Sequence, residues 1–207
     1  MASWAELLTV TEPGEHVVQL YGEDDQLLTR NVSRYLAEGL RRGDGLVVVA
    51  TPEHTSALVR HLGEEEPRLA REAAGAGRLV YLDARETLAR LLDAGRPEEH
   101  RFRTVIGTVL QSVRARSTSG SSRAFGEMVS LLWDDGRRED AARLEALWNT
   151  ILLDHECSLF CAYRIDLFAP AEAGELHPIV CSHDHVLAGA GTLLSGGRPR
   201  LIRSSCS

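Results

Sequence analysis

Residues 45–54 read Gly-Leu-Val-Val-Val-Ala-Thr-Pro-Glu-His, and this stretch decides the fold class. The run from Gly45 to Ala50 is apolar without alternation and rich in valine, which is typical of a strand buried on both faces of a parallel sheet. Thr51 can then cap a helix that has Pro52 at its first position. A buried strand followed directly by a helix predicts an α/β fold with a mostly parallel sheet.

The same pattern of strand and helix repeats along the chain. Short apolar runs predict four more strands, at residues 16–21, 78–83, 123–127 and 157–163. Apolar residues at helical spacing predict helices at residues 27–40, 52–62, 86–93 and 102–113, and a helical hairpin at 129–152. Right-handed crossovers between parallel strands place helices on both faces, so we expect a doubly wound sheet.

The C-terminal part of the sequence has a weaker pattern. Residues 178–187 are predicted to form one short helix, and residues 188–207 are rich in glycine and serine, which predicts a flexible tail. A length of 207 residues fits one domain when about 150 residues make a typical domain. We therefore expect a single domain over residues 1–187.

Composition and charge exclude several classes of protein. Apolar residues make up 43% of the chain and charged residues 26%, which is ordinary for a globular protein. The net charge of −7 opposes direct binding to nucleic acid, which needs a basic face. Neither a long apolar run nor a secretory signal is present, so we expect a cytoplasmic protein without a membrane segment.

The loop after the first predicted strand is unsuited to phosphate. Open parallel sheets bind ligands beyond the carboxyl ends of their strands, and here Gly22-Glu-Asp-Asp25 offers one glycine and three carboxylates. All 23 basic residues are arginine, so the lysine of a phosphate-binding loop is absent. No motif of a hydrolase or zinc protease occurs either. We expect no enzymatic activity and no cofactor.

Several polar residues fall at or just past the predicted strand ends, along one rim of the sheet. A pocket mouth there would be lined by Tyr21, Glu23, Asp24, Thr51, Glu53, His54, Asp83 and Glu127. A local interpretation stays open, because Thr51 and Asp83 can cap helices and Glu127 can pair with a buried arginine such as Arg123.

The helical hairpin offers two further kinds of residue for such a site. Trp133 and Trp148 are expected mainly to pack the hairpin, which would cover a bound ligand. Glu145 and Asn149 lie one helical turn apart, where they either line a pocket or face water. The predicted ligand-binding residues are Tyr21, Glu23, Thr51, His54, Asp83, Glu127 and Trp133.

Cys181, His183 and His185 alternate along one short segment, as metal ligands on an extended chain do. Cys157 and Cys161 share one face of a predicted strand, and a site that combines them with Cys181 or His183 is sterically conceivable. The alternative interpretation is that these cysteines are small buried hydrophobes and the histidines lie on the surface. Because the spacings match no strong pattern, we expect no metal.

Several runs carry a resemblance to a known family. They are Arg123-Ala-Phe-Gly-Glu-Met-Val-Ser-Leu-Leu-Trp133, Leu144-Glu-Ala-Leu-Trp-Asn149, Leu159-Phe-Cys-Ala-Tyr163, His16-Val-Val-Gln-Leu-Tyr21 and Ala50-Thr-Pro-Glu-His54. Together they resemble the MEDS domain, the methanogen/methylotroph sensory domain of DcmR-type regulators, across residues 16–187. The resemblance implies a RecA- or KaiC-like fold without a working phosphate loop. It also implies a signal-input module, associated with histidine kinases and transcription regulators and proposed to sense small organic compounds.

The main hypothesis is therefore a non-enzymatic sensory module that binds a small organic ligand. Since no effector domain follows in this sequence, we expect it to signal to a separate regulatory protein, such as a histidine kinase or a transcription regulator; a homodimer is a further candidate assembly. Two alternatives stay open, a nucleotide-binding relic of the RecA-like fold and an interaction module without a ligand.

Overall fold

The computed structural model describes residues 10–165, 181–188 and 200–203, together with Leu8 and Ile179. Within this part of the chain, one sheet has the strand order β3-β2-β6-β7-β1-β8-β9. Its strands are β1 (His16–Tyr21), β2 (Gly45–Ala50), β3 (Leu79–Asp83), β6 (Ser122–Gly126), β7 (Cys157–Arg164), β8 (His185–Ala188) and β9 (Arg200–Arg203). All neighbouring strands are parallel except β9, which runs antiparallel to β8.

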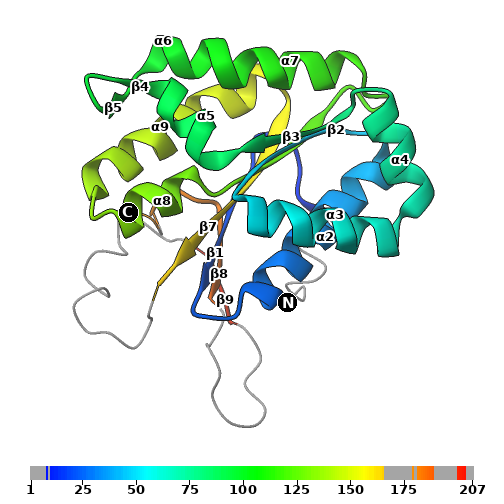
Figure 1. Ribbon diagram of the computed structural model, residues 1–207, viewed down its shortest axis with the longest axis horizontal. Helices are drawn as coiled ribbons and strands as arrows, with labels where there is room; N and C mark the ends of the chain where they lie inside the picture. The colour runs from blue at the N-terminus through cyan, green and yellow to red at the C-terminus, as the bar shows by residue number, and fades with distance from the viewer. Residues whose placement is uncertain (1–7, 9, 166–178, 180, 189–199, 204–207) are drawn as a thin grey trace, which may run out of the picture.

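Helices cover both faces of this sheet, as expected for a doubly wound fold (Figure 1). On one face lie α2 (Asp25–Arg42), α3 (Pro52–Glu65) and α4 (Pro67–Gly75). On the other lie α5 (Ala84–Leu91), α6 (Glu99–Phe102), α7 (Thr108–Ala115), α8 (Met128–Asp134) and α9 (Arg138–Asp154). A π-helical turn (Arg103–Gly107) joins α6 to α7, and a small ribbon of β4 (Leu92–Asp93) and β5 (Arg96–Pro97) follows α5.

The position of strand β2 inside the sheet explains why its sequence is apolar without alternation. Val47 and Val49 belong to the core beneath α5–α9, whereas Leu46 and Val48 belong to the core beneath α2–α4. Both faces of the strand are therefore buried by helices. The predicted α/β class and mostly parallel sheet are confirmed.

The five predicted strands all form, with ends that differ from the prediction by one residue at most. The short helix predicted at residues 178–187 is wrong from His185 onward, where the chain forms β8 and pairs with β1 from Val17 to Leu20. Pairing with the open edge of β1 outweighs the weak local preference. Of the predicted tail, only Ala188 and Arg200–Arg203 are described, and both are strand segments.

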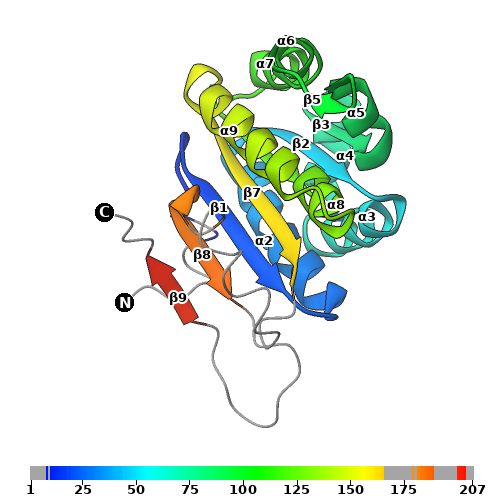
Figure 2. The same ribbon diagram turned by 90° about the vertical axis from the view of Figure 1, so that its left-hand side faces the viewer.

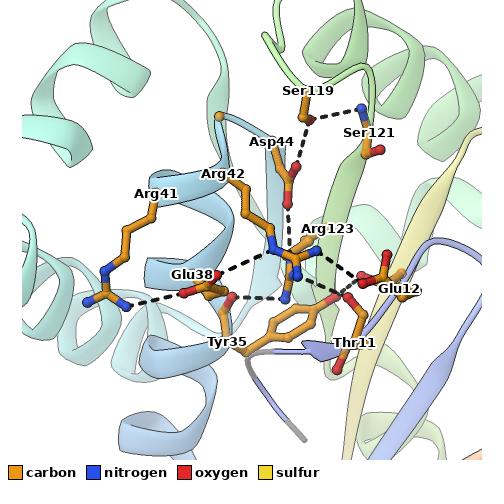
Figure 3. Close-up of polar contacts among 12 residues, drawn as sticks. Thr11, Glu12, Tyr35, Glu38, Arg41, Arg42, Asp44, Ser119, Ser121 and Arg123 are labelled. Atoms are coloured by element: carbon orange, nitrogen blue, oxygen red, sulfur yellow. Dashed lines mark hydrogen bonds and ion pairs between the residues drawn. The ribbon is translucent and has the colours of Figure 1, made fainter. Parts of the chain in front are cut away.

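A buried ion pair joins Asp44, the residue before β2, to Arg123 of β6 at the amino ends of the strands (Figure 3). The Nε atom of Arg123 lies 2.9 Å from Oδ2 of Asp44, and Ser119 donates to the other carboxylate oxygen at 2.6 Å. Arg123 also donates to the backbone carbonyls of Leu8 and Thr11. This network lies at the opposite end of the strands from the predicted pocket mouth.

No helix in the described ranges has the length and apolar character that a membrane span requires.

Candidate functional site

The structure brings part of the predicted rim together around Glu127, which directly follows β6. The Glu127 carboxylate accepts hydrogen bonds from the backbone N–H of Thr51 and, at 2.5 Å, from Nδ1 of His54. This hydrogen bond raises the pKa of His54, against the opposing effect of burial. Burial likewise raises the pKa of Tyr21, and the nearby charges of Glu127 and Asp25 add to the rise. The alternative in which Glu127 pairs with Arg123 is wrong, because Arg123 pairs with Asp44 at the other end of β6.

The remaining rim residues have local roles or lie apart. The Asp83 carboxylate accepts from the backbone N–H of Glu86 and so caps α5, while Thr51 caps α3 through the N–H of His54. Asp83 also ends β3, which three strands separate from β1. Glu23 is exposed in the loop after β1.

The N-terminus of α2 already has a negative cap. Asp24 accepts from the backbone N–H of Leu27 at 2.9 Å, and Asp25 occupies the first turn. A phosphate group would bind the same free N–H groups at a helix N-terminus. Asp24 therefore occupies the position that a polyphosphate would need, and the negative charges of Asp24 and Asp25 would repel its phosphate groups.

A cavity of about 500 Å³ lies between the α8–α9 hairpin, strand β7 and the segment before β8. Figure 2 shows both helices lying over the β7 side of the sheet. The cavity is lined by Trp133, Arg138, Glu139, Ala141, Ala142, Glu145, Ala146, Asn149, Tyr163, Ile179 and Ser182. Trp133 is the one predicted ligand-binding residue among them.

Aromatic packing shapes one wall of the cavity. The Trp133 ring packs edge-on against Tyr163, with ring centroids 5.5 Å apart and planes at 84°. The guanidinium group of Arg138 lies 3.8 Å from the centroid of the Trp133 ring, a cation–π arrangement. These contacts hold Trp133 as a buried wall residue.

Polar side chains from α9 form the base of the cavity. Glu145 is only 2% exposed and accepts a hydrogen bond of 2.7 Å from the hydroxyl of Tyr163. Asn149 accepts from Nδ1 of His16 at 2.7 Å and donates to the carbonyl of Ser182 at 3.0 Å. Of the two alternatives for this helical turn, the structure therefore shows the pocket-lining one.

Beneath that base lies a cluster of four buried groups, His16, Glu145, Cys161 and His183, which we call the four-residue cluster. His16 Nε2 lies 3.1 Å from Cys161 Sγ and 3.4 Å from a Glu145 oxygen, and His183 Nε2 lies 3.4 Å from the other Glu145 oxygen. Burial lowers the pKa of His16 to about 3, so its imidazole is neutral near pH 7. Burial and the Glu145 charge raise the pKa of the Cys161 thiol.

Of the metal-ligand candidates from the sequence, only some join this cluster. His183 does, and so does Cys161, one of the two strand cysteines. Cys181 is disulfide-bonded, so its sulfur offers no thiolate, and His185 lies beside Glu15 at 3.4 Å. The interpretation that groups Cys181, His183 and His185 as one site is therefore wrong.

Sequence reasoning did not identify His16 as a site residue. It lies in an apolar strand of which every residue is buried, and strand alternation places it on the same face as Val18 and Leu20. A histidine at an inward position of such a strand needs a polar partner in the core. Its presence in the sequence could therefore have indicated a buried polar site.

Comparisons with known proteins agree with this architecture. The profile of the MEDS family, described as the methanogen/methylotroph, DcmR sensory domain, matches residues 15–184. The fold is similar to the crystal structure of a KaiC-like protein from the hyperthermophilic archaeon Pyrococcus horikoshii OT3, with 14% sequence identity and a TM-score of 0.55. That match covers 91% of this chain and 77% of the other, and it shows a shared fold alone. No curated protein matches the chain.

Proposed function

Because this chain belongs to the MEDS family of sensory domains, we propose that it senses a small organic molecule and signals to a regulatory protein without catalysing a reaction. The sensory role follows from the family. The ligand, its site and the partner are proposals, for which the candidates are a histidine kinase, a transcription regulator or a second copy of the chain.

The cavity between the α8–α9 hairpin and β7 is the observation that carries this proposal. Its volume of about 500 Å³ falls within the range of about 300–1,000 Å³ that is usual for small-molecule sites. Trp133, Ile179 and three alanines supply apolar wall, while Glu145 and Asn149 supply polar groups at the base. This pattern favours a ligand with an apolar body and one hydrogen-bonding group.

The cavity also suggests how binding becomes a signal. One wall belongs to the α8–α9 hairpin, and the other consists of Tyr163 on β7 with Ile179 and Ser182 before β8. A ligand that fills the space would therefore stabilise one packing of the hairpin against these segments. A ligand shifts such an equilibrium only by its difference in affinity for the two packings. The partner would then recognise the packing that the ligand favours.

A thermal-shift screen of small organic compounds tests the proposal. At a concentration about 100-fold above Kd, a ligand stabilises the folded state by about 2.7 kcal/mol, which raises Tm by about 5–10 °C for a domain of this size. Ala146→Phe should abolish the shift, because Ala146 lines the cavity and is exposed enough to accept a larger side chain. Glu127→Gln serves as the control and should keep the shift.

If Glu127→Gln loses the shift and Ala146→Phe keeps it, the ligand binds at the predicted rim around Tyr21, Thr51, His54 and Glu127. A ligand that stabilises both variants as well as the wild type would exclude both sites. A screen in which no compound raises Tm would favour the alternative of an interaction module without a ligand.

A further inference from the structure

We propose that the four-residue cluster, His16, Glu145, Cys161 and His183, binds a divalent transition-metal ion of the zinc class. The site lies beneath the base of the cavity, and the inference does not depend on the identity or existence of the organic ligand. Zn²⁺ takes nitrogen, sulfur and oxygen ligands in four-coordinate tetrahedral sites, and two imidazoles, one thiolate and one carboxylate are such a set.

The fold assembles the cluster from four separate segments. His16 begins β1, Cys161 lies in the neighbouring strand β7, Glu145 comes from α9 above them, and His183 comes from the segment that leads into β8. The parallel register pairs Cys161 with Val18. Val18 is two residues after His16, so the side chains of Cys161 and His16 lie on the same face of the sheet. Chemically reactive groups that converge from four segments point to a shared ligand.

The spacing of the donor atoms is close to that of a tetrahedral centre. Bonds of about 2.0–2.3 Å to the metal place neighbouring ligand atoms about 3.3–3.8 Å apart in a tetrahedron. His16 Nε2 lies 3.4 Å and Cys161 Sγ 3.8 Å from one Glu145 oxygen, whereas His183 Nε2 lies 3.4 Å from the other oxygen. His16 Nε2 and Cys161 Sγ are 3.1 Å apart, slightly closer than in a metal-bound tetrahedron. All four donor atoms lie within 4.8 Å of one another.

The surrounding hydrogen bonds orient both imidazoles for coordination. His16 donates through Nδ1 to the Asn149 side chain, and His183 donates through Nδ1 to the carbonyl of Ile179 at 2.6 Å. In the neutral rings this leaves both Nε2 lone pairs directed into the cluster. Outer groups of this kind fix the tautomer of metal-binding histidines, and the Tyr163 hydroxyl orients Glu145 in the same way.

Charge gives an independent reason for a cation at this place. Glu145 is buried, and among the residues that the structure describes its recorded polar contacts are imidazole, thiol and phenol groups, none of which carries a permanent positive charge. A buried carboxylate is costly without a cation or a full set of hydrogen bonds. When a divalent ion binds, the Cys161 thiol loses its proton to solvent, and the thiolate and the Glu145 carboxylate together balance the charge of the ion.

His16 lies between Cys161 and Asn149 and contacts both, as the histidine of a Cys-His-Asn catalytic triad does. A nucleophilic cysteine needs access to substrate and a lowered thiol pKa. Cys161 is fully buried, and the Glu145 carboxylate beside it disfavours the thiolate in the protein alone. The triad would also leave Glu145 and His183 without a role, so a metal centre accounts for more of the arrangement.

The test uses Zn²⁺ and Co²⁺ alone, added to chelator-treated full chain. Elemental analysis after dialysis should find about one Zn²⁺ per chain, as for a structural tetrahedral site. Co²⁺ should give the intense absorption of a thiolate–cobalt bond. Cys157→Ser is the matched control, because Cys157 is equally buried on β7 but lies outside the cluster. It should keep both signals, whereas Cys161→Ser should lose the thiolate–cobalt band.

Asn149→Leu tests the orienting hydrogen bond and should weaken Zn²⁺ binding by about 10–100-fold. The cobalt spectrum of the wild-type chain requires no variant to fold, so a negative result there cannot be attributed to misfolding of a variant. Absence of bound Zn²⁺, or bound Co²⁺ without a thiolate band, would overturn the proposal. Rapid alkylation of Cys161 by iodoacetamide in a wild-type protein that takes up no metal would indicate the triad instead.

Discussion

Three buried acidic side chains, Asp44, Glu127 and Glu145, have three different kinds of partner. Asp44 pairs with the permanently charged Arg123, and Glu127 pairs with the titratable His54 and a backbone N–H. Glu145 contacts imidazole, thiol and phenol groups. Each pairing therefore responds differently to pH, to substitution and to added cations.

The pair of His54 and Glu127 predicts a pH-dependent contribution to stability. The pKa of His54 is raised in the folded protein, so its protonated form stabilises the fold fully below the unfolded pKa of about 6.5. This contribution is lost as the pH rises through the folded pKa. His54→Gln should therefore lower the free energy of unfolding by about 1–2 kcal/mol at about pH 5.5, and by less at about pH 9.

Urea unfolding of both proteins at the two pH values measures this difference. The other charged groups that face His54 are Asp25 and Glu53, and both favour its protonated form. A difference that grows as the pH rises would contradict the assigned direction of the shift.

The pair of Arg123 and Asp44 predicts a larger effect of substitution. Arg123→Met leaves the buried Asp44 carboxylate without its cation, which should destabilise the fold by about 3–5 kcal/mol. Adding Asp44→Asn should recover part of this loss, because the unpaired charge is then removed. Chemical denaturation of the wild type, both single variants and the double variant gives the coupling energy. A double variant no more stable than Arg123→Met would argue against the pairing.

Local chemistry made some of these residues predictable. The capping roles of Thr51 and Asp83 follow from a side-chain oxygen just before a helix, and the structure has both. The partner of Arg123 was not predictable, because Asp44 is 79 residues away and only the pairing of β2 with β6 brings them together. Long-range polar contacts depend on strand order, which local patterns do not contain.

At the level of elements, two glycines make a matched pair of tests. A Cβ atom on Gly45 would lie 2.6 Å from the backbone of Val113, because α7 packs directly against the start of β2. Gly45→Ala should therefore destabilise the fold by about 1–3 kcal/mol through overpacking. Gly63 lies inside α3 with open space around it, so Gly63→Ala should stabilise by about 0.5–1 kcal/mol.

Thermal unfolding of the two variants measures both effects. They should shift Tm in opposite directions, although the chemical change is the same. Equal shifts would show that helix α7 does not approach β2 as closely as described.

Long periodic elements were predictable, whereas short edge elements were not. Helix α2 has many apolar residues at helical spacing, and strand β2 is a continuous apolar run rich in valine, so the sequence alone indicates both elements. The four residues of β8 become a strand because β1 offers an unpaired edge. The continuous helix expected at residues 102–113 contains a π turn at Arg103–Gly107, a feature that apolar periodicity does not reveal.

At the level of the whole molecule, the acidic cap of α2 predicts that nucleotides bind poorly. Asp24 occupies the helix N-terminus and Asp25 adds a second negative charge at the place where phosphates bind in related architectures. Isothermal titration with ATP and Mg²⁺ should give no binding in the micromolar range. Micromolar affinity that Asp24→Asn leaves unchanged would mean that nucleotide binds elsewhere on the fold.

The architecture followed from the sequence, but the location of the cavity beside Trp133 did not. Alternating strands and helices predict a sheet whose strand ends share one rim, and that reasoning directs attention to Tyr21 and Glu127. The cavity instead depends on the way the α8–α9 hairpin lies over β7, which is a matter of packing angle. His16 and Cys161 are 145 residues apart and meet only after β1 and β7 have paired.

Helix α9 has one further consequence. Glu145 and Asn149 both line the cavity, and Glu145 also belongs to the four-residue cluster, while Asn149 accepts a hydrogen bond from its His16. A single turn of this helix therefore borders both sites. Any organic molecule that alters the affinity of the cluster for a cation must have its own affinity altered by the same factor, since the two equilibria share one cycle. If both proposed ligands bind, helix α9 would couple their affinities, and the response of the chain would depend on the organic molecule and the cation together.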